Sequence, residues 1–200
     1  MSIPARVGAG LAICAALAAT TPEQARAAAG YPLEAVLADA RRLCAASPDV
    51  QVAAEGRLPA GWKVVIPHQG SWHDTYLKEY QRGPSRKDVR ALAATVEGRS
   101  LEAVVVTVYG QQESTICEVV DRGAVFSPDD ERMSRWAGRP PVIARKDRYP
   151  GLYGWTWSPG LDPASHTAVV NYATASAAES MGVRSGLTYL SFTLPRQTSK

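Results

Sequence analysis

The sequence lacks most of the short motifs that mark enzymes of known reaction type. It contains no Gly-x-Ser-x-Gly elbow, no Ser-x-x-Lys pair and no His-Glu-x-x-His helix, and it has only three histidines and three cysteines. Its isolated glycines, 151–154 and 182–186, lack the strand, glycine-rich loop and helix that a nucleotide site requires. These absences argue against the common serine hydrolases, zinc proteases and nucleotide-binding proteins, and we expect no cofactor.

Strong charge of one sign is also lacking. The formal net charge is +3, and the Lys and Arg residues are dispersed along the chain, so no basic stripe indicates a nucleic-acid partner. One-fifth of the residues are charged and 46% are hydrophobic, which is typical of a globular domain.

Long hydrophobic runs are absent except near the N-terminus. The apolar run 7–20 is about fourteen residues, shorter than the ~20 residues that a helix needs to cross a bilayer. It follows the basic Arg6 and precedes small residues at Ala25 and Ala27, which is the pattern of a cleaved signal peptide. We therefore expect residues 1–27 to be removed.

Removal of this leader predicts a soluble, exported protein that is periplasmic or secreted, with residues 28–200 forming a single domain and no transmembrane segment. Cleavage after Ala29 is an alternative. Lipidation of Cys14 is disfavoured because Ile13 stands where a lipoprotein signal requires a small residue.

Two cysteines remain after the leader, Cys44 and Cys117. An even number of cysteines in an oxidising compartment favours a single disulfide over two buried thiols. The chain-entropy model gives such a bridge about 4 kcal/mol of stabilisation as an upper figure.

The first helix is predicted over residues 31–46. A continuous apolar stripe has the spacing of one helix face, and it places Cys44 toward the core; its members are Leu33, Val36, Leu37, Ala40, Leu43 and Cys44. Ser47 followed by Pro48 predicts a short second helix over 48–55.

The segment 101–120 has the pattern of a hairpin at the centre of the fold. Two runs rich in β-branched residues flank the polar turn 110–114. Alternation gives the first run apolar side chains on both sides, which indicates an interior strand, and Cys117 lies in the middle of the second run.

The remaining elements follow from local signals. Ser85 and Asp88 form a capping-box-like start for a helix through Val89, Leu92, Ala93 and Val96 that ends at Gly98. Another helix is predicted over 128–138, and 67–80 is predicted to be irregular. Further strands are predicted at 62–66, 149–157, 167–172 and 187–194, with 124–126 as a candidate extension and 173–182 as helix or loop.

These elements predict an α+β domain. Its sheet should be mostly antiparallel with about five or six strands, and the N-terminal helix should pack on one face, fixed there by the single disulfide.

Candidate catalytic residues lie mainly in the segment 68–74. His73 and Asp74 are candidates for a base and its orienting acid in a small hydrolase, with His68 and the distant His166 as further candidates. Ser71 and Ser165 are possible nucleophiles, and the spacing selects neither. The histidines and Asp74 are also ordinary zinc or copper ligands, but a loop histidine is more often a solvated polar residue, so we assign no metal site.

Aromatic residues alternate along 149–157. Tyr149, Tyr153, Trp155 and Trp157 share one side of a strand, and the last three form a candidate binding platform for a sugar ring or an apolar partner. The favoured alternative is that these rings fill the core of a small domain. Trp62, Trp72 and Trp136 are likewise interpreted as packing residues.

The sequence favours a non-enzymatic binding or interaction protein of the bacterial envelope, with an unknown protein or envelope ligand as its partner. The alternative is a small hydrolase or metal-binding protein that uses the segment 68–74. A third hypothesis is a purely structural envelope component.

Overall fold

The computed structural model describes residues 30–50, 58–81, 87–109, 114–145 and 149–194. The chain divides into two units, 1–30 and 31–200, and the described helices and strands all belong to the second unit. The expected leader and the part of the expected second helix after Val50 lie outside the described residues. None of the helices in the described ranges is long and apolar enough to cross a membrane.

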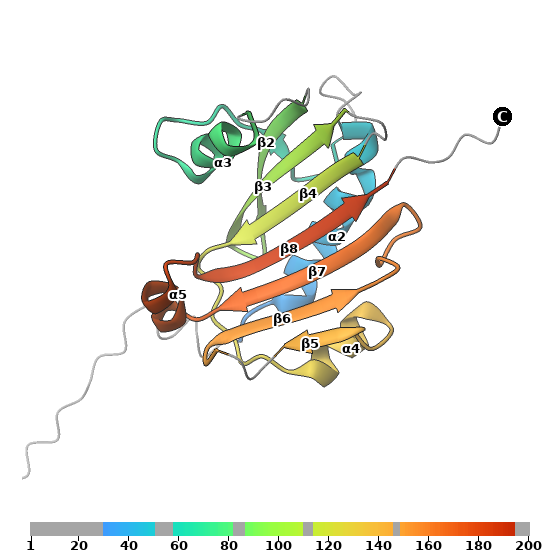
Figure 1. Cartoon of the computed structure of the whole chain (residues 1–200), viewed down its shortest axis with the longest axis vertical. Helices are drawn as coiled ribbons and strands as arrows, with labels where there is room; N and C mark the ends of the chain where they lie inside the picture. Colours follow the sequence, from blue (N-terminus) through green and yellow to red (C-terminus); the bar gives the residue numbers. More distant parts are fainter. Residues whose placement is uncertain (1–29, 51–57, 82–86, 110–113, 146–148, 195–200) are drawn as a thin grey trace, which may run out of the picture. The chain divides into compact units, whose positions relative to one another are not determined.

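A single antiparallel sheet of eight strands organises the second unit, in the order β1-β2-β3-β4-β8-β7-β6-β5 (Figure 1). The strands are β1 (Lys63–Val64), β2 (Lys87–Val96), β3 (Arg99–Val108), β4 (Ser114–Asp121), β5 (Ile143–Arg145), β6 (Leu152–Trp157), β7 (Ser165–Ala173) and β8 (Gly186–Thr193). The helices are α2 (Leu33–Val50), α3 (Trp72–Gln81), α4 (Asp130–Ala137) and α5 (Ala175–Met181). The pairing of β4 with β8 joins two meanders, β1 to β4 and β5 to β8.

The α+β class, the antiparallel sheet and the single disulfide are confirmed, whereas the predicted strand count is wrong. The sheet has eight strands instead of five or six, because β2 and β5 were not predicted as strands. The β5 strand has three residues at the edge of the sheet, shortly after Pro140 and Pro141. Segment 124–126 is a loop and does not extend the sheet.

The helix predicted from Ser85 to Gly98 is wrong, because its described part, from Lys87, forms β2. Val96 pairs with Arg99, which leaves a two-residue turn between β2 and β3. Both turn residues have positive φ, 46° at Glu97 and 74° at Gly98, as a type I′ hairpin turn requires. Long-range pairing with β3 thus overrides a sequence pattern that is also compatible with a helix.

The segment 67–80 was predicted to be irregular, but most of it forms helix α3. The Asp74 backbone N–H donates a 3.1 Å hydrogen bond to Ser71 Oγ at the start of the helix. Asp74 also forms an i, i+4 ion pair with Lys78 at 2.8 Å. Ser71 with Asp74 three residues later is a capping-box-like signal that the sequence contains.

The end of the first helix differs from its prediction, and the segment 173–182, left open between helix and loop, contains a helix. Helix α2 continues to Val50 instead of ending at Ala46, so Pro48 lies within it and does not begin a second helix. The open choice over 173–182 is settled by α5, which begins after the N-cap Thr174 and ends at Gly182 with φ 64°.

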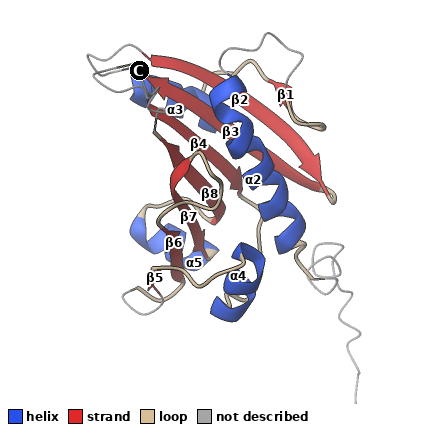
Figure 2. Ribbon diagram, turned by 90° about the vertical axis from the view of Figure 1, so that its right-hand side faces the viewer, coloured by secondary structure: helices blue, strands red, loops and turns tan. Residues whose placement is uncertain are grey.

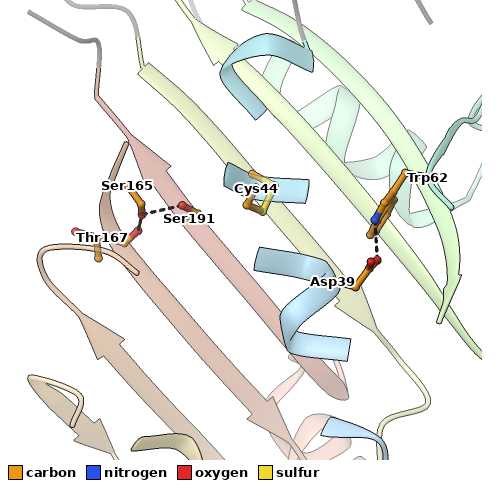
Figure 3. Close-up of a disulfide and its surroundings, with 7 residues drawn as sticks. Asp39, Cys44, Trp62, Ser165, Thr167 and Ser191 are labelled. Carbon is orange, nitrogen blue, oxygen red and sulfur yellow. Dashed lines mark hydrogen bonds between the residues drawn. A yellow bond between two sulfur atoms is a disulfide. The ribbon is translucent and has the colours of Figure 1, made fainter. Parts of the chain in front are cut away.

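Helix α2 lies across one face of the sheet (Figure 2). The Cys44–Cys117 disulfide joins it to β4, with the two Cα atoms 5.4 Å apart (Figure 3). Beside it, the Trp62 indole N–H donates a 2.8 Å hydrogen bond to the buried carboxylate of Asp39. The core therefore lies between α2 and this face, and its helix side chains are those of the predicted stripe: Leu33, Val36, Leu37, Ala40 and Leu43.

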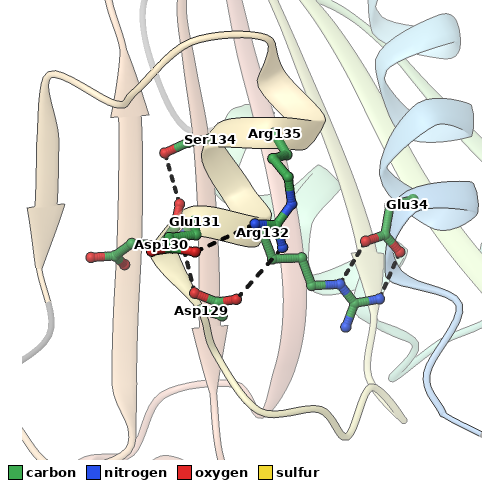
Figure 4. Close-up of polar contacts among 7 residues, drawn as sticks. All are labelled: Glu34, Asp129, Asp130, Glu131, Arg132, Ser134 and Arg135. Carbon is green, nitrogen blue, oxygen red and sulfur yellow. Dashed lines mark hydrogen bonds and ion pairs between the residues drawn. The ribbon is translucent and has the colours of Figure 1, made fainter.

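Helix α4 covers the same side of the sheet as α2 (Figure 2). It begins at Asp130 after the N-cap Asp129, two residues later than the predicted start at 128, and it ends at Gly138 with φ 75°, as predicted. Arg132 donates two 2.6 Å hydrogen bonds to the carboxylate of Glu34 and so connects α4 to α2 (Figure 4). This exposed bidentate pair links the two helices, while Met133 and Trp136 pack α4 against the core.

Candidate functional site

The two faces of the sheet differ in what covers them. Helices α2 and α4 cover one face, and α3 covers the opposite face over β2 and β3 and reaches Val120 on β4. None of the described helices lies in front of β8, β7 and β6 on that second face (Figure 1). We call this uncovered part, together with the adjoining strand β4, the open face. Its side chains are those of Ile116, Glu118, Thr156, Thr167, Val169, Asn171, Thr188, Leu190 and Phe192.

Three of the six side chains that β7 and β8 place on the open face are apolar: Val169, Leu190 and Phe192. Phe192 is 36% exposed, and Leu190 and Val169 are half-buried. Leu190 lies directly opposite Val169, and Phe192 lies opposite Thr167. Apolar area that stays in contact with water in this way is unfavourable unless a partner covers it.

Glu118 lies on β4, at the border between the open face and the part of the same face that α3 covers. The strand registers place it opposite Val104 on β3 and opposite Leu190 on β8. Its same-face neighbours along β4 are Ile116 and Val120. Glu118 is only 9% exposed, and no described residue donates a hydrogen bond to its carboxyl group. A nine-tenths buried acid therefore lies among aliphatic side chains.

Burial raises the pKa of Glu118 to about 7, and the positive charge of Arg184 opposes part of this increase. Loss of hydration disfavours the carboxylate, and an apolar neighbourhood offers no hydrogen bond in exchange. Acids with such a raised pKa are concentrated at functional sites. Here, the acid also adjoins an uncovered surface.

An aromatic corner from α3 borders Glu118. Trp72 and Tyr76 pack with their ring centroids 5.1 Å apart on the covered part of the same face, where they contact Val104 and Val120. The guanidinium of Arg184, which follows α5, lies 5.6 Å from the Trp72 ring centroid and 5.5 Å from that of Tyr76. These distances are within the range of cation–π attraction.

A second arginine lies near the same corner. The Arg122 guanidinium is 6.0 Å from the Trp72 ring centroid, and its Nε atom is 3.2 Å from a carboxylate oxygen of Glu102. Arg184 differs from Arg122, because none of the described carboxylates lies within 4.0 Å of its guanidinium. The corner thus contains two cations. Arg122 is paired with Glu102, whereas Arg184 is near Glu118 but does not contact it.

The candidate residues of segment 68–74 do not form a base and orienting-acid pair. His73 is 5% exposed, and its Nε2–H donates a 3.2 Å hydrogen bond to the Ala103 carbonyl, while burial lowers the pKa of the imidazole. Asp74 instead contacts Lys78, and this hydrogen bond lowers the pKa of Asp74. His68 is exposed in the turn before α3. The structure therefore directs His73 and Asp74 toward different partners.

His166 is remote from this segment. It is exposed on β7, which is three strand spacings, or about 14 Å, from β3. The neighbouring Ser165 is buried, and its Oγ lies 2.9 Å from Ser191 Oγ (Figure 3). The histidine candidates are not brought together, and the described residues contain no group of three or more His, Cys, Asp or Glu that could hold a metal ion.

The aromatic residues of β6 lie on the face that packs against the helices. Trp155 and Trp157 are buried, and their indole N–H groups donate to Asp130 and to the Arg139 carbonyl, respectively. Tyr153 is partly buried and packs against the same core. This burial agrees with the core-filling alternative, so we do not place a ligand on these rings.

Sequence reasoning did not identify Glu118 or Arg184. A signal for Glu118 exists, because it is the acid inside an interior strand of otherwise apolar or small residues, 114–120. The proximity of Arg184 depends on the pairing of β4 with β8, which local sequence patterns do not show. Comparisons with known proteins add no further assignment: no protein-family model, no curated protein and no solved structure matches this chain.

Proposed function

We propose that this protein is a non-enzymatic binding domain that holds a polypeptide segment of a partner protein on its open face. One observation carries the proposal: Phe192, Leu190 and Val169 stay in contact with solvent on a sheet face that no described helix covers there. Contiguous apolar surface on a folded domain is characteristic of an interaction site.

The charge of the site supports a specific kind of partner segment. Glu118 is a buried acid beside this apolar surface, and none of the described residues donates a hydrogen bond to it. A segment with apolar side chains and one basic residue complements both features, because it covers the apolar area and brings a positive charge to the carboxylate. An acidic segment would be repelled by Glu118.

Export to the periplasm or the medium belongs to the same proposal. The buried bridge between Cys44 and Cys117 is of the kind that persists in oxidising compartments. Residues 1–27 have the charge and hydrophobicity pattern of a signal peptide. The partner would then be another protein of the bacterial envelope.

The test is a selection of random twelve-residue peptides on the immobilised domain, followed by measurement of the dissociation constants of the enriched peptides. Phe192→Asp should weaken their binding about tenfold or more, because it places a charge in the apolar contact. Ile66→Asp is the matched control, since Ile66 is 94% exposed near β1 and away from the open face. Failure to enrich any peptide, or equal binding to wild type and Phe192→Asp, would contradict the proposal.

A further inference from the structure

We propose that Glu118, Trp72 and Tyr76 form a receptor for one cationic group of a ligand, and that Arg184 of the chain itself occupies this receptor in the structure. The inference rests on the proposed function, because it assigns the receptor to the basic side chain of the bound segment. It adds the chemical class of that group, lysine or arginine, and a residue that competes with it.

Glu118 provides the first argument. Its carboxyl group is nine-tenths buried, lies between Val104 and Leu190, and receives no hydrogen bond from the described residues. A buried carboxylate is costly unless a positive charge or hydrogen-bond donors accompany it. An unpartnered acid at the border of an uncovered surface is therefore suited to a cation that arrives with a ligand.

The aromatic rings provide the second argument. Trp72 and Tyr76 both lie within 6 Å of the same guanidinium, that of Arg184, measured from the ring centroids. The electron-rich faces of these rings attract cations, and lysine, arginine and alkylammonium groups are the usual occupants of such sites. The position that Arg184 takes thus shows where a cation is stabilised next to Glu118.

Arg184 is suited to be displaced. It is exposed, it lies between the end of α5 and the start of β8, and its charge has no carboxylate within 4.0 Å among the described residues. Gly182 and Gly186 bracket this short connection, with φ values of 64° and 102°. A side chain on such a connection can leave the aromatic corner while the sheet stays unchanged, because the backbone of Gly186 is packed against that of Asp121.

The geometry also identifies the form of ligand that fits. A group with an apolar stem and a terminal positive charge would lay its stem along the apolar row that includes Leu190, with the charge at Glu118. Lysine and arginine side chains have this form. Neutral alcohols of the same length lack the charge, and carboxylates carry the wrong sign.

The experiment uses n-hexylguanidinium as the probe, with n-hexanol as the neutral control, at pH 8. Binding is followed by the indole N–H resonance of Trp72 in the full mature chain. Arg184→Ala should increase the affinity for n-hexylguanidinium about tenfold relative to wild type, because the internal competitor is removed. Adding Glu118→Gln to that variant should abolish the gain, and n-hexanol should show neither effect.

An unchanged affinity in Arg184→Ala, or equal affinity of Arg184→Ala and the double variant, would overturn the receptor. Both variants should fold, because Arg184 is exposed and Glu118→Gln removes a buried charge. Failure of the receptor is distinguishable from failure of the proposed function. If peptides bind Phe192→Asp more weakly than wild type but n-hexylguanidinium gives no response, the open face is still a binding site. That combination would refute only the cationic receptor.

Discussion

Replacing Glu118 by glutamine should stabilise the folded protein at alkaline pH. The substitution keeps the size and shape of the side chain but removes the charge that the apolar surroundings of Val104 and Leu190 disfavour. Because this acid is 9% exposed, solvent screens the effect only weakly. Most single substitutions destabilise a protein, even those that keep the size of the side chain. A stabilising effect of Glu118→Gln would therefore be informative by its sign.

The magnitude follows from the pKa of Glu118. Burial raises that pKa from 4.5 in the unfolded chain to about 7 in the folded protein. A carboxyl group with a raised pKa binds more protons in the folded state, so the free energy of unfolding falls as the pH rises from about 4 to about 8. A difference of about 2.5 pKa units corresponds to a loss of about 3 kcal/mol above pH 8, and no loss below pH 4.

Urea denaturation of wild type and Glu118→Gln at several pH values between 4 and 8 measures this difference directly. His73 titrates in part of the same range with the opposite sign, since its pKa is lowered by burial and folded-state stability therefore rises with pH. Subtracting the two proteins cancels this contribution. Glu179→Gln on the exposed side of α5 is the control for loss of a surface charge. A constant difference between wild type and Glu118→Gln across the range would refute the assignment of Glu118 as a buried, unpartnered acid.

Three further predictions concern the framework of the fold. Replacing both Cys44 and Cys117 by alanine should lower the free energy of unfolding by about 4 kcal/mol, because the bridge closes a loop with a sequence separation of 73; urea titration measures the loss. Asp121→Asn should cost about 2 kcal/mol in the same assay, since the buried carboxylate accepts two hydrogen bonds from Arg99 at 2.9 and 2.8 Å, and an unchanged midpoint would contradict this role. Gly186→Ala should lower the thermal midpoint and cost more than about 2 kcal/mol, because φ is 102° and a Cβ would overlap the Asp121 carbonyl oxygen.

Local sequence patterns were sufficient for the elements whose signals agree with one another. The stripe of α2 places Cys44 toward the core, Cys117 lies in the middle of a predicted strand, and the even number of cysteines after the leader predicts that these two form the disulfide. Helix α4 was predictable for a similar reason, because Gly138 ends it as predicted, although its cap is Asp129 and the helix begins two residues later than expected. Capping and hydrophobic periodicity act within a few residues, so a single sequence reveals them.

The segment that forms β2 shows where such patterns fail. Val89, Leu92, Ala93 and Val96 fit the spacing of a helix, but pairing with β3 along ten residues makes this segment a strand. The competing signal was Glu97-Gly98, a two-residue turn that joins β2 to the strand already expected. Helix α3 was not predicted because the capping signal of Ser71 at its start was not used.

The open face could not be derived from the sequence. Glu118 faces the uncovered surface because α2 packs on the other face of β4. Arg184 lies near Glu118 because β4 pairs with β8, which joins the two meanders. The residues of segment 68–74 are candidates in the sequence because histidine and aspartate can act as acids, bases or metal ligands. Their partners in the fold, Ala103 for His73 and Lys78 for Asp74, give them local structural contacts.

The central claim is that the open face, with Glu118 at its border, is the binding surface. Amide chemical shifts of the isotope-labelled protein during titration with an enriched peptide test this claim most directly. The account predicts that the largest shift changes map to 114–121, 165–173 and 186–193, together with the side-chain N–H of Arg184. Changes confined to α2 and α4, on the other side of the sheet, would contradict it.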